Sequence, residues 1–138
     1  MATRLEIVTP KGRVYSDDVD IVVVPGSEGE LGVLSSHVPL VTPLKPGELR
    51  ISKAGKEHSF AVGSGFLEVT ASSVTVLSDL AVDEDEIDEF AVTRALEEAR
   101  KALANPDEIR DPDRSSALQL SILNSMAQLE LKKRKKPL

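Results

Sequence analysis

The hydrophobic pattern of the chain changes its period near residue 80, and this change fixes the kind of fold that the sequence can adopt. Before Asp79, short runs rich in Val, Ile and Thr are separated by turn-forming Pro, Gly and Ser residues, as is typical of β-strands. After Asp79, apolar residues recur every three or four positions, as they do on one face of an α-helix. We therefore expect a β module followed by a helical module.

The first module is expected to contain several short strands joined by tight turns. Proline presets φ and glycine supplies φ > 0 in such turns, as in Pro10-Lys11-Gly12. The strands are expected at residues 5–9, 19–24, 31–34, 48–52, 58–62, 66–70 and 74–77. Short strands at regular spacing are typical of sandwiches and barrels. We therefore predict an antiparallel β-sandwich or barrel over residues 1–82.

Residues 83–138 are expected to form an antiparallel αα-hairpin, so that the fold class is α+β arranged as two modules. Asp83 and Glu86 are spaced as in a capping box at a helix start, and Pro106 ends this helix. Pro112 suits the first position of a second helix that reaches about Lys133. The apolar face of the first helix is expected to contain Ile87, Phe90, Ala91, Ala95, Ala99, Ala102 and Leu103.

The second helix carries apolar residues on two nearly opposite sides. One stripe contains Leu118, Ile122, Met126 and Leu129, and the other contains Leu120, Leu123, Ala127 and Leu131. One helical neighbour cannot cover both, and leaving one stripe in water would forgo about 6 to 12 kcal/mol. Two interpretations stay open: the helix lies between the first helix and the sheet module or a second copy of the chain, or it exchanges between partners.

The segment 26–39 places three glycines among carboxylates directly after a Val-rich strand. A loop that binds phosphate needs free N–H groups beside a Lys and a Ser or Thr, whereas Glu28 and Glu30 would place negative charge beside the anion. We interpret the segment as a tight turn with an acidic tip that contacts another protein. His37 is expected to be a loop residue without a catalytic role.

Composition narrows the function further. The chain has no Cys and only two His residues, so we predict no disulfide, no metal site and no catalytic residue. Its net charge of −6 argues against nucleic acid as a partner, and no apolar run is long enough to span a bilayer. Ser64 lacks the G-x-S-x-G pattern of a nucleophile elbow, so Gly63 and Gly65 are expected to mark a bulge or a close backbone approach.

Several motifs, in this order, resemble the epsilon subunit of bacterial F-type ATP synthase. They are Val24-Pro25-Gly26-Ser27-Glu28-Gly29-Glu30-Leu31-Gly32-Val33-Leu34, His37-Val38-Pro39-Leu40, Lys45-Pro46-Gly47-Glu48-Leu49-Arg50-Ile51 and Gly63-Ser64-Gly65-Phe66-Leu67-Glu68-Val69. The resemblance implies a non-catalytic rotor subunit of the central stalk of a proton-translocating complex, with no cofactor of its own. It would lie at the cytoplasmic face of the cell membrane and reach the membrane only through the complex.

The resemblance also implies partners and contact residues. The sandwich would join the gamma subunit to the ring of c subunits. The turn facing the c ring would contain Ser27, Glu28, Gly29, Glu30 and Leu31, with His37 near the contact between gamma and the ring.

For the helices, the resemblance implies a folded state on the sandwich and an extended state along gamma. In the extended state the second helix would contact the catalytic alpha and beta subunits and restrain ATP hydrolysis. The contact residues would be the stripe Leu118, Ile122, Met126 and Leu129 and the basic run Lys132, Lys133, Arg134, Lys135 and Lys136. The basic run would pair with an acidic segment of the beta subunit.

Two alternative functions differ from this expectation. The first is an ATP-sensing regulatory module, because some members of the family bind ATP through an Asp-x-x-Arg-Ala pattern. Here the matching stretch is Ala91-Val92-Thr93-Arg94-Ala95, which lacks the carboxylate but keeps Arg94 as a candidate nucleotide-binding residue. The second is an independent enzyme or sugar-binding sandwich, which one Tyr and no Trp disfavour because sugar-stacking surfaces need aromatic residues.

Overall fold

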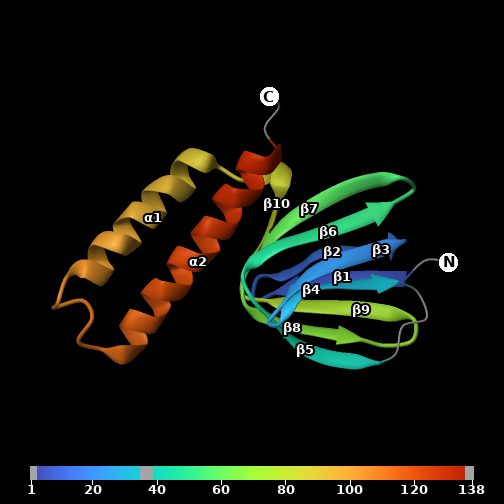
Figure 1. Cartoon of the computed structure of the whole chain (residues 1–138), viewed down its shortest axis with the longest axis horizontal. Coiled ribbons are helices and arrows are strands. Elements are labelled where there is room, and N and C mark those ends of the chain that lie inside the picture. Colours follow the sequence, from blue (N-terminus) through green and yellow to red (C-terminus); the bar gives the residue numbers. More distant parts are fainter. Residues whose placement is uncertain (1–2, 35–38, 136–138) are drawn as a thin grey trace.

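The computed structural model of the chain describes residues 3–34 and 39–135. Within these ranges it contains ten strands, one short 3-10 helix and two α-helices. The strands form one module, and the two α-helices form a hairpin beside it (Figure 1). The predicted fold class, a β-sandwich or near-barrel followed by a helical hairpin, is confirmed.

The strands form one continuous hydrogen-bonded system. Their bounds are β1 (Thr3–Thr9), β2 (Gly12–Val19), β3 (Ile21–Gly26), β4 (Gly29–Leu34), β5 (Leu40–Leu44), β6 (Gly47–Lys53), β7 (Lys56–Val62), β8 (Gly65–Val69), β9 (Ser73–Ser78) and β10 (Ala81–Asp83). The strand order is β10-β7-β6-β3-β5-β8-β9-β1-β2, and β4 pairs with β3. Among the described pairs, β1 with β9 is parallel and the others are antiparallel.

The core of the sandwich comes from side chains two positions apart, which point to the same face of a strand. The alternating buried pairs include Leu5 and Ile7, Val22 and Val24, and Val74 and Val76. They belong to one cluster that also contains Leu49 and Leu67. The period of two seen in the sequence therefore marks the inward face of each strand.

Strands β2, β5 and β10 were not expected from the sequence. In β2 and β5, the residue types explain why the strand was missed. Strand β2 contains Ser16, Asp17 and Asp18, which are poor strand formers, yet it pairs with β1 along its length. Strand β5 contains Pro43, which cannot donate a backbone hydrogen bond, yet it pairs with β8 from Leu40 to Leu44. Tertiary pairing with strong neighbouring strands overrides the local preference in both.

The first α-helix begins later than the capping box at Asp83 and Glu86 predicts. Asp83 belongs to β10, where it pairs with Phe60, and its carboxylate accepts from Asp85 N at the short 3-10 helix η1 (Glu84–Glu86). Helix α1 (Glu89–Ala104) is capped instead by Asp88, which accepts from Ala91 N at 3.1 Å. Helix α2 spans Pro112–Lys135. Strand β10 ends at Asp83, and the division into modules at residues 82 and 83 stays a prediction.

Helix α2 lies between α1 and the sandwich (Figure 1), where it contacts β6 and β7. Leu131 is 1% exposed and packs with Ala61 and Ile87 in a small cluster. Leu118 from the opposite stripe is also buried. Both sides of α2 are therefore used within one chain, as the first of the two interpretations requires.

The predicted apolar face of the first helix is partly wrong. Phe90 is 73% exposed, whereas Leu96, which was not assigned to that face, is buried with Ala99. Helix α1 starts after η1, and only its inner side meets α2.

On α2, Leu123 and Met126 are exposed because neither α1 nor the sandwich fully covers them.

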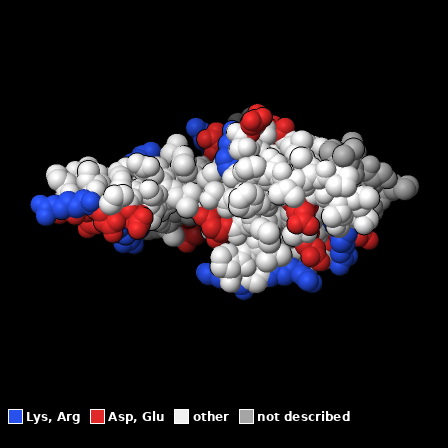
Figure 2. All heavy atoms as spheres, turned by 90° about the horizontal axis from the view of Figure 1, so that it is seen from below, with Lys and Arg blue, Asp and Glu red and all other residues white. Residues whose placement is uncertain are grey.

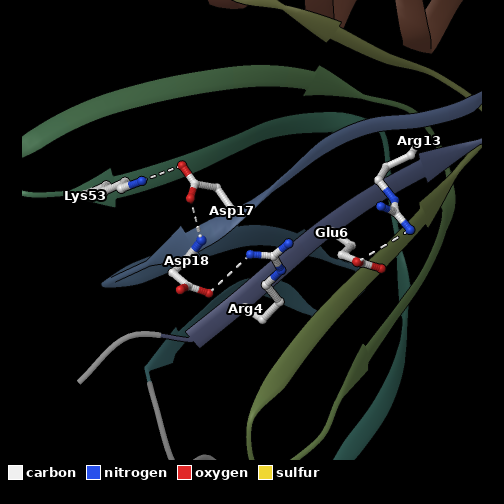
Figure 3. A network of polar contacts seen from close by, with 6 residues as sticks. All are labelled: Arg4, Glu6, Arg13, Asp17, Asp18 and Lys53. Carbon is white, nitrogen blue, oxygen red and sulfur yellow. Dashed lines mark hydrogen bonds and ion pairs between the residues drawn. The ribbon is translucent and has the colours of Figure 1, made fainter.

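Ion pairs stabilise the outer edge of the sandwich (Figure 3). Arg4 pairs with Asp18 on β2, and Lys53 at the end of β6 pairs with Asp17 on β2. The second pair joins strands that are far apart in the hydrogen-bonded order and so helps to close the sheet. The hydrogen bond from Lys53, followed by that from the Asp18 backbone N–H, lowers the pKa of Asp17.

Replacing Lys53 with Gln should raise the pKa of Asp17 toward its ordinary value, because the first cause of its lowering is removed. A lowered folded-state pKa stabilises the fold above the unfolded-state pKa of about 3.9, and this contribution is lost as the pH falls through the folded value. The Asp17 pKa can be measured by NMR titration. Lys56→Gln is the matched control, and an Asp17 pKa that is unchanged by Lys53→Gln would contradict the assignment.

The close backbone approach predicted for Gly63 and Gly65 is confirmed at Gly65, whereas a Cβ at Gly63 would meet the side chains of Asp79 and Asn124. A Cβ at Gly65 would collide with the carbonyl oxygen of Leu77, whereas a Cβ at Gly32 would meet open space. Gly65→Ala should therefore lower the free energy of unfolding by more than about 1 kcal/mol, and Gly32→Ala should change it by less than about 0.5 kcal/mol. Denaturant unfolding measures both, and equal effects would show that β8 and β9 separate to admit the methyl group.

Candidate partner-binding site

The predicted acidic tip is the two-residue turn between β3 and β4. Gly26 pairs with Gly29, so Ser27 and Glu28 form the turn. Gly29 has φ +129°, and a Cβ at Gly26 would collide with the Gly29 carbonyl oxygen. Both positions therefore need glycine, and the turn exposes backbone as well as carboxylates.

Backbone hydrogen bonds hold this turn against β5. Ser27 N donates to Pro43 O at 3.1 Å, and Lys45 N donates to Pro25 O at 2.9 Å. Together the turn and β5 line a shallow depression of about 500 Å³, whose lining includes Leu31, Leu40 and Pro43. Ser27, Glu28, Gly29 and Glu30 are exposed, and Leu31 is half-buried.

An apolar row continues from this depression across the outer face of the sandwich. Cross-strand neighbours place Pro43 beside Phe66, Phe66 beside Leu77 and Leu77 beside Val8, and such neighbours share a face. Phe66 is 55% exposed and Leu77 is 45% exposed. We call Pro43, Phe66, Leu77 and Val8 the outer apolar row. Contiguous exposed apolar surface of this kind marks interaction sites.

The sequence contains one signal for the outer apolar row that the strand pattern alone does not reveal. Phe66 and Leu77 each lie one position away from a buried residue, Leu67 and Val76. An apolar residue at the outward position of a strand is not needed by the core, and several such residues side by side favour an interaction site. The outward position could not be assigned before the strand register was known.

The predicted helix contacts lie in different environments. Leu118 is buried, Ile122 and Leu129 are half-buried, and Met126 is 44% exposed. Lys132 is half-buried, Lys133 and Arg134 are exposed, and Lys135 is the last residue of α2. His37 and Lys136 lie outside the described residues.

Charged side chains join the turn to α2, although sequence reasoning did not connect them. Arg50 Nη1 lies 2.8 Å from Glu30 Oε2 and 3.6 Å from Glu48 Oε1. Arg134 also pairs with Glu48 Oε1, and Ser59 Oγ donates to Glu48 Oε2 at 2.8 Å. On the visible face of Figure 2, charged side chains gather in small groups around a broad uncharged area.

Arg94 lies on the outer side of α1. Its Cζ atom is 6.0 Å from the centroid of the exposed Phe90 ring. The surrounding groove is also lined by Glu89 and Glu97. Two carboxylates beside a single guanidinium do not favour the phosphates of a nucleotide.

His58 was not assigned a role from the sequence. Its Nε2 atom lies 2.8 Å from Asp83 Oδ2 and its Nδ1 atom 3.2 Å from Glu84 Oε1. His58, Asp83 and Asp85 form the one group in the described part of the chain whose ligand atoms could meet at a metal ion. Because both ring nitrogens already face carboxylates, we assign His58 the structural role of tying β7 to the start of the helical module.

Within residues 3–34 and 39–135, no helix combines the length and the hydrophobicity that a bilayer crossing requires.

Comparison with known proteins identifies the class of this chain. A family model described as ATP synthase, Delta/Epsilon chain, beta-sandwich domain matches residues 2–84. The sandwich with its attached hairpin is therefore a chain of the ATP synthase Delta/Epsilon class.

Relatives that match most of the chain identify its family more narrowly. The ATP synthase epsilon chain of Pelotomaculum thermopropionicum is 48% identical over 101 residues, covering 73% of this chain and 75% of the relative. The ATP synthase epsilon chain of Dehalococcoides mccartyi is 39% identical over 137 residues, covering 97% of this chain and 96% of the relative. The chain belongs to the family of ATP synthase epsilon chains.

Solved structures agree with this placement. A chain in the cryo-EM structure of the Euglena gracilis mitochondrial ATP synthase, OSCP/F1/c-ring in rotational state 1, has a TM-score of 0.74 and 26% identity, covering 91% of this chain and 78% of that chain. A chain in the central stalk and c-ring structure of the Tetrahymena thermophila mitochondrial ATP synthase has a TM-score of 0.57 and 16% identity, covering 97% of this chain and 96% of that chain. The second likeness concerns the fold alone.

Proposed function

We propose that this chain is a non-catalytic rotor subunit in the central stalk of a proton-translocating ATP synthase. Its sandwich joins the gamma subunit to the c ring at the cytoplasmic face of the membrane, which it reaches only through the complex. The main observation that supports this proposal is the exposed β3–β4 turn, which is continuous with the outer apolar row through Pro43. The turn would meet the polar loops of the ring, and the apolar row would meet gamma.

The sandwich is suited to mechanical coupling because the turn is fixed to a packed module. Backbone hydrogen bonds join the turn to β5, and β5 pairs along its length with β8. Strand β8 contributes Leu67 and Val69 to the core. A force applied at the turn is therefore transmitted through hydrogen-bonded strands and closely packed side chains, whose compressibility is low.

We also propose that the helical hairpin restrains ATP hydrolysis when α2 leaves the sandwich and contacts the catalytic alpha and beta subunits. In the docked state, α2 is held by Leu131 in a small apolar cluster and by the Arg134–Glu48 pair. Burial of one Leu side chain contributes roughly 1.5 to 3 kcal/mol. Contacts of this extent are small enough for a partner to shift the equilibrium by its differential affinity for the two states.

The ATP-sensing alternative receives no support from the arrangement of α1. Arg94 faces Phe90 and shares its groove with Glu89 and Glu97. We therefore retain regulation through the hairpin without assigning it a nucleotide.

A cysteine placed in the β3–β4 turn tests the ring contact. The chain has no native Cys, so a Glu28→Cys variant carries one thiol. After assembly into the synthase, we expect it to crosslink to a c subunit. Lys56→Cys is the matched control because the strand register places it at the far end of the sheet. Crosslinking from Lys56→Cys and from none of the positions 27–30 would overturn the contact.

Removal of residues 84–138 tests the restraint on hydrolysis. The remaining chain keeps all ten strands, so the complex should assemble and hydrolyse ATP faster than the complex with the full chain. Subunit content by gel and the rate of phosphate release measure the two effects. Normal assembly with an unchanged hydrolysis rate would contradict the regulatory role and leave the rotor role standing.

A further inference from the structure

The charged groups between the β3–β4 turn and α2 alternate in sign along a continuous path. We call Glu30, Arg50, Glu48 and Arg134 the ion-pair chain. Arg50 bridges the two carboxylates through one nitrogen, Nη1. Glu48 in turn meets Arg50 and Arg134 through one oxygen, Oε1. Each inner member is therefore shared between two partners.

Burial makes Glu48 the member whose pairing matters most. Its side chain is 11% exposed, compared with 59% for Glu30 and 54% for Arg134. A carboxylate held so far from water requires compensation by nearby positive charge or hydrogen-bond donors. Ser59 satisfies one oxygen, so Arg50 and Arg134 share the compensation of the other.

Because Arg50 and Arg134 pair with the same oxygen, Glu48 Oε1, the two arginines compete for it. Arg50 lies closer to Glu30, at 2.8 Å, than to Glu48, at 3.6 Å. While Glu30 holds Arg50, Glu48 is available to Arg134. When Glu30 is occupied by another donor, Arg50 can move toward Glu48 and take part of the charge compensation that Arg134 supplies.

The surrounding elements allow a movement of Arg50 toward Glu48 to affect α2. Glu48 and Arg50 lie two positions apart on β6 and so share a face of the strand. Arg134 lies in the last turn of α2, beside a groove of about 240 Å³ lined by Pro46, Met126 and Leu131 among others. The groove gives the Arg134 side chain room to leave Glu48 without disturbing the sandwich core.

We propose that the ion-pair chain couples the β3–β4 turn to the docking of α2, so that a partner binding Glu30 weakens the Arg134–Glu48 pair and favours release of the helix. The identity of that partner, a hydrogen-bond donor or cation on a loop of the c ring, rests on the proposed function. The coupling itself is a property of the isolated chain. It is reciprocal, so a docked α2 weakens binding at Glu30 by the same factor.

Hydrogen exchange of the full, isolated chain tests the coupling, because it detects rare opening of a docked helix. Glu30→Gln imitates an occupied Glu30, because it removes the negative charge that holds Arg50. We expect the backbone amides of residues 124–134 to exchange about two- to fivefold faster, the range for partly exposed ion pairs. Glu28→Gln, which changes the neighbouring carboxylate outside the ion-pair chain, should leave these rates unchanged.

A variant of Arg50 distinguishes coupled ion pairs from independent ones. Arg50→Gln removes the competitor of Arg134, so exchange in the same segment should slow, and Glu30→Gln should then have no further effect. Independent surface ion pairs would instead give additive effects. The proposal is overturned if Glu30→Gln behaves like Glu28→Gln, or if its effect persists in the Arg50→Gln background. Neither measurement involves the c ring, so a failed ring crosslink would remove the proposed partner and not the coupling.

Discussion

Burial of the inward-facing Val, Leu and Ile side chains of the sandwich is the constraint on which the rest of the molecule depends. Once Leu5, Val22 and Val76 face the core, the direction of every neighbouring side chain is fixed by the alternation along its strand. Phe66 and Leu77 are exposed for this reason, and Glu48 and Arg50 share a face. The outer apolar row is thus a geometric consequence of the core.

The two modules are joined in a way that leaves the hairpin separable. Helix α1 packs on α2, and α2 contacts β6 and β7. The apolar part of that contact centres on Leu131, Ala61 and Ile87, whereas the sandwich core contains many more buried residues. The sandwich core does not depend on the hairpin contact, and this arrangement is consistent with the proposed mechanical and regulatory roles.

The sequence predicted features that depend on local pattern and could not predict those that depend on register. The period change, the helical hairpin and the close approach at Gly65 follow from residue types and spacing. Strand β2 could not be predicted because its Asp17 and Asp18 disfavour a strand until β1 and Lys53 hold them. The Glu48–Arg134 and His58–Asp83 contacts join residues far apart in the sequence, and no local signal connects them.

The parallel pairing of β1 with β9 also constrains how the protein can fold. It joins the first strand of the sandwich to one of its last, so the chain must close a loop that contains most of the module before that pair can form. Such distant contacts slow folding, because the entropy of loop closure is lost before the contact is gained. During synthesis, β1 must wait until β9 has left the ribosome. The helices follow β9 in the chain, so they emerge when the surface that receives them can already be complete.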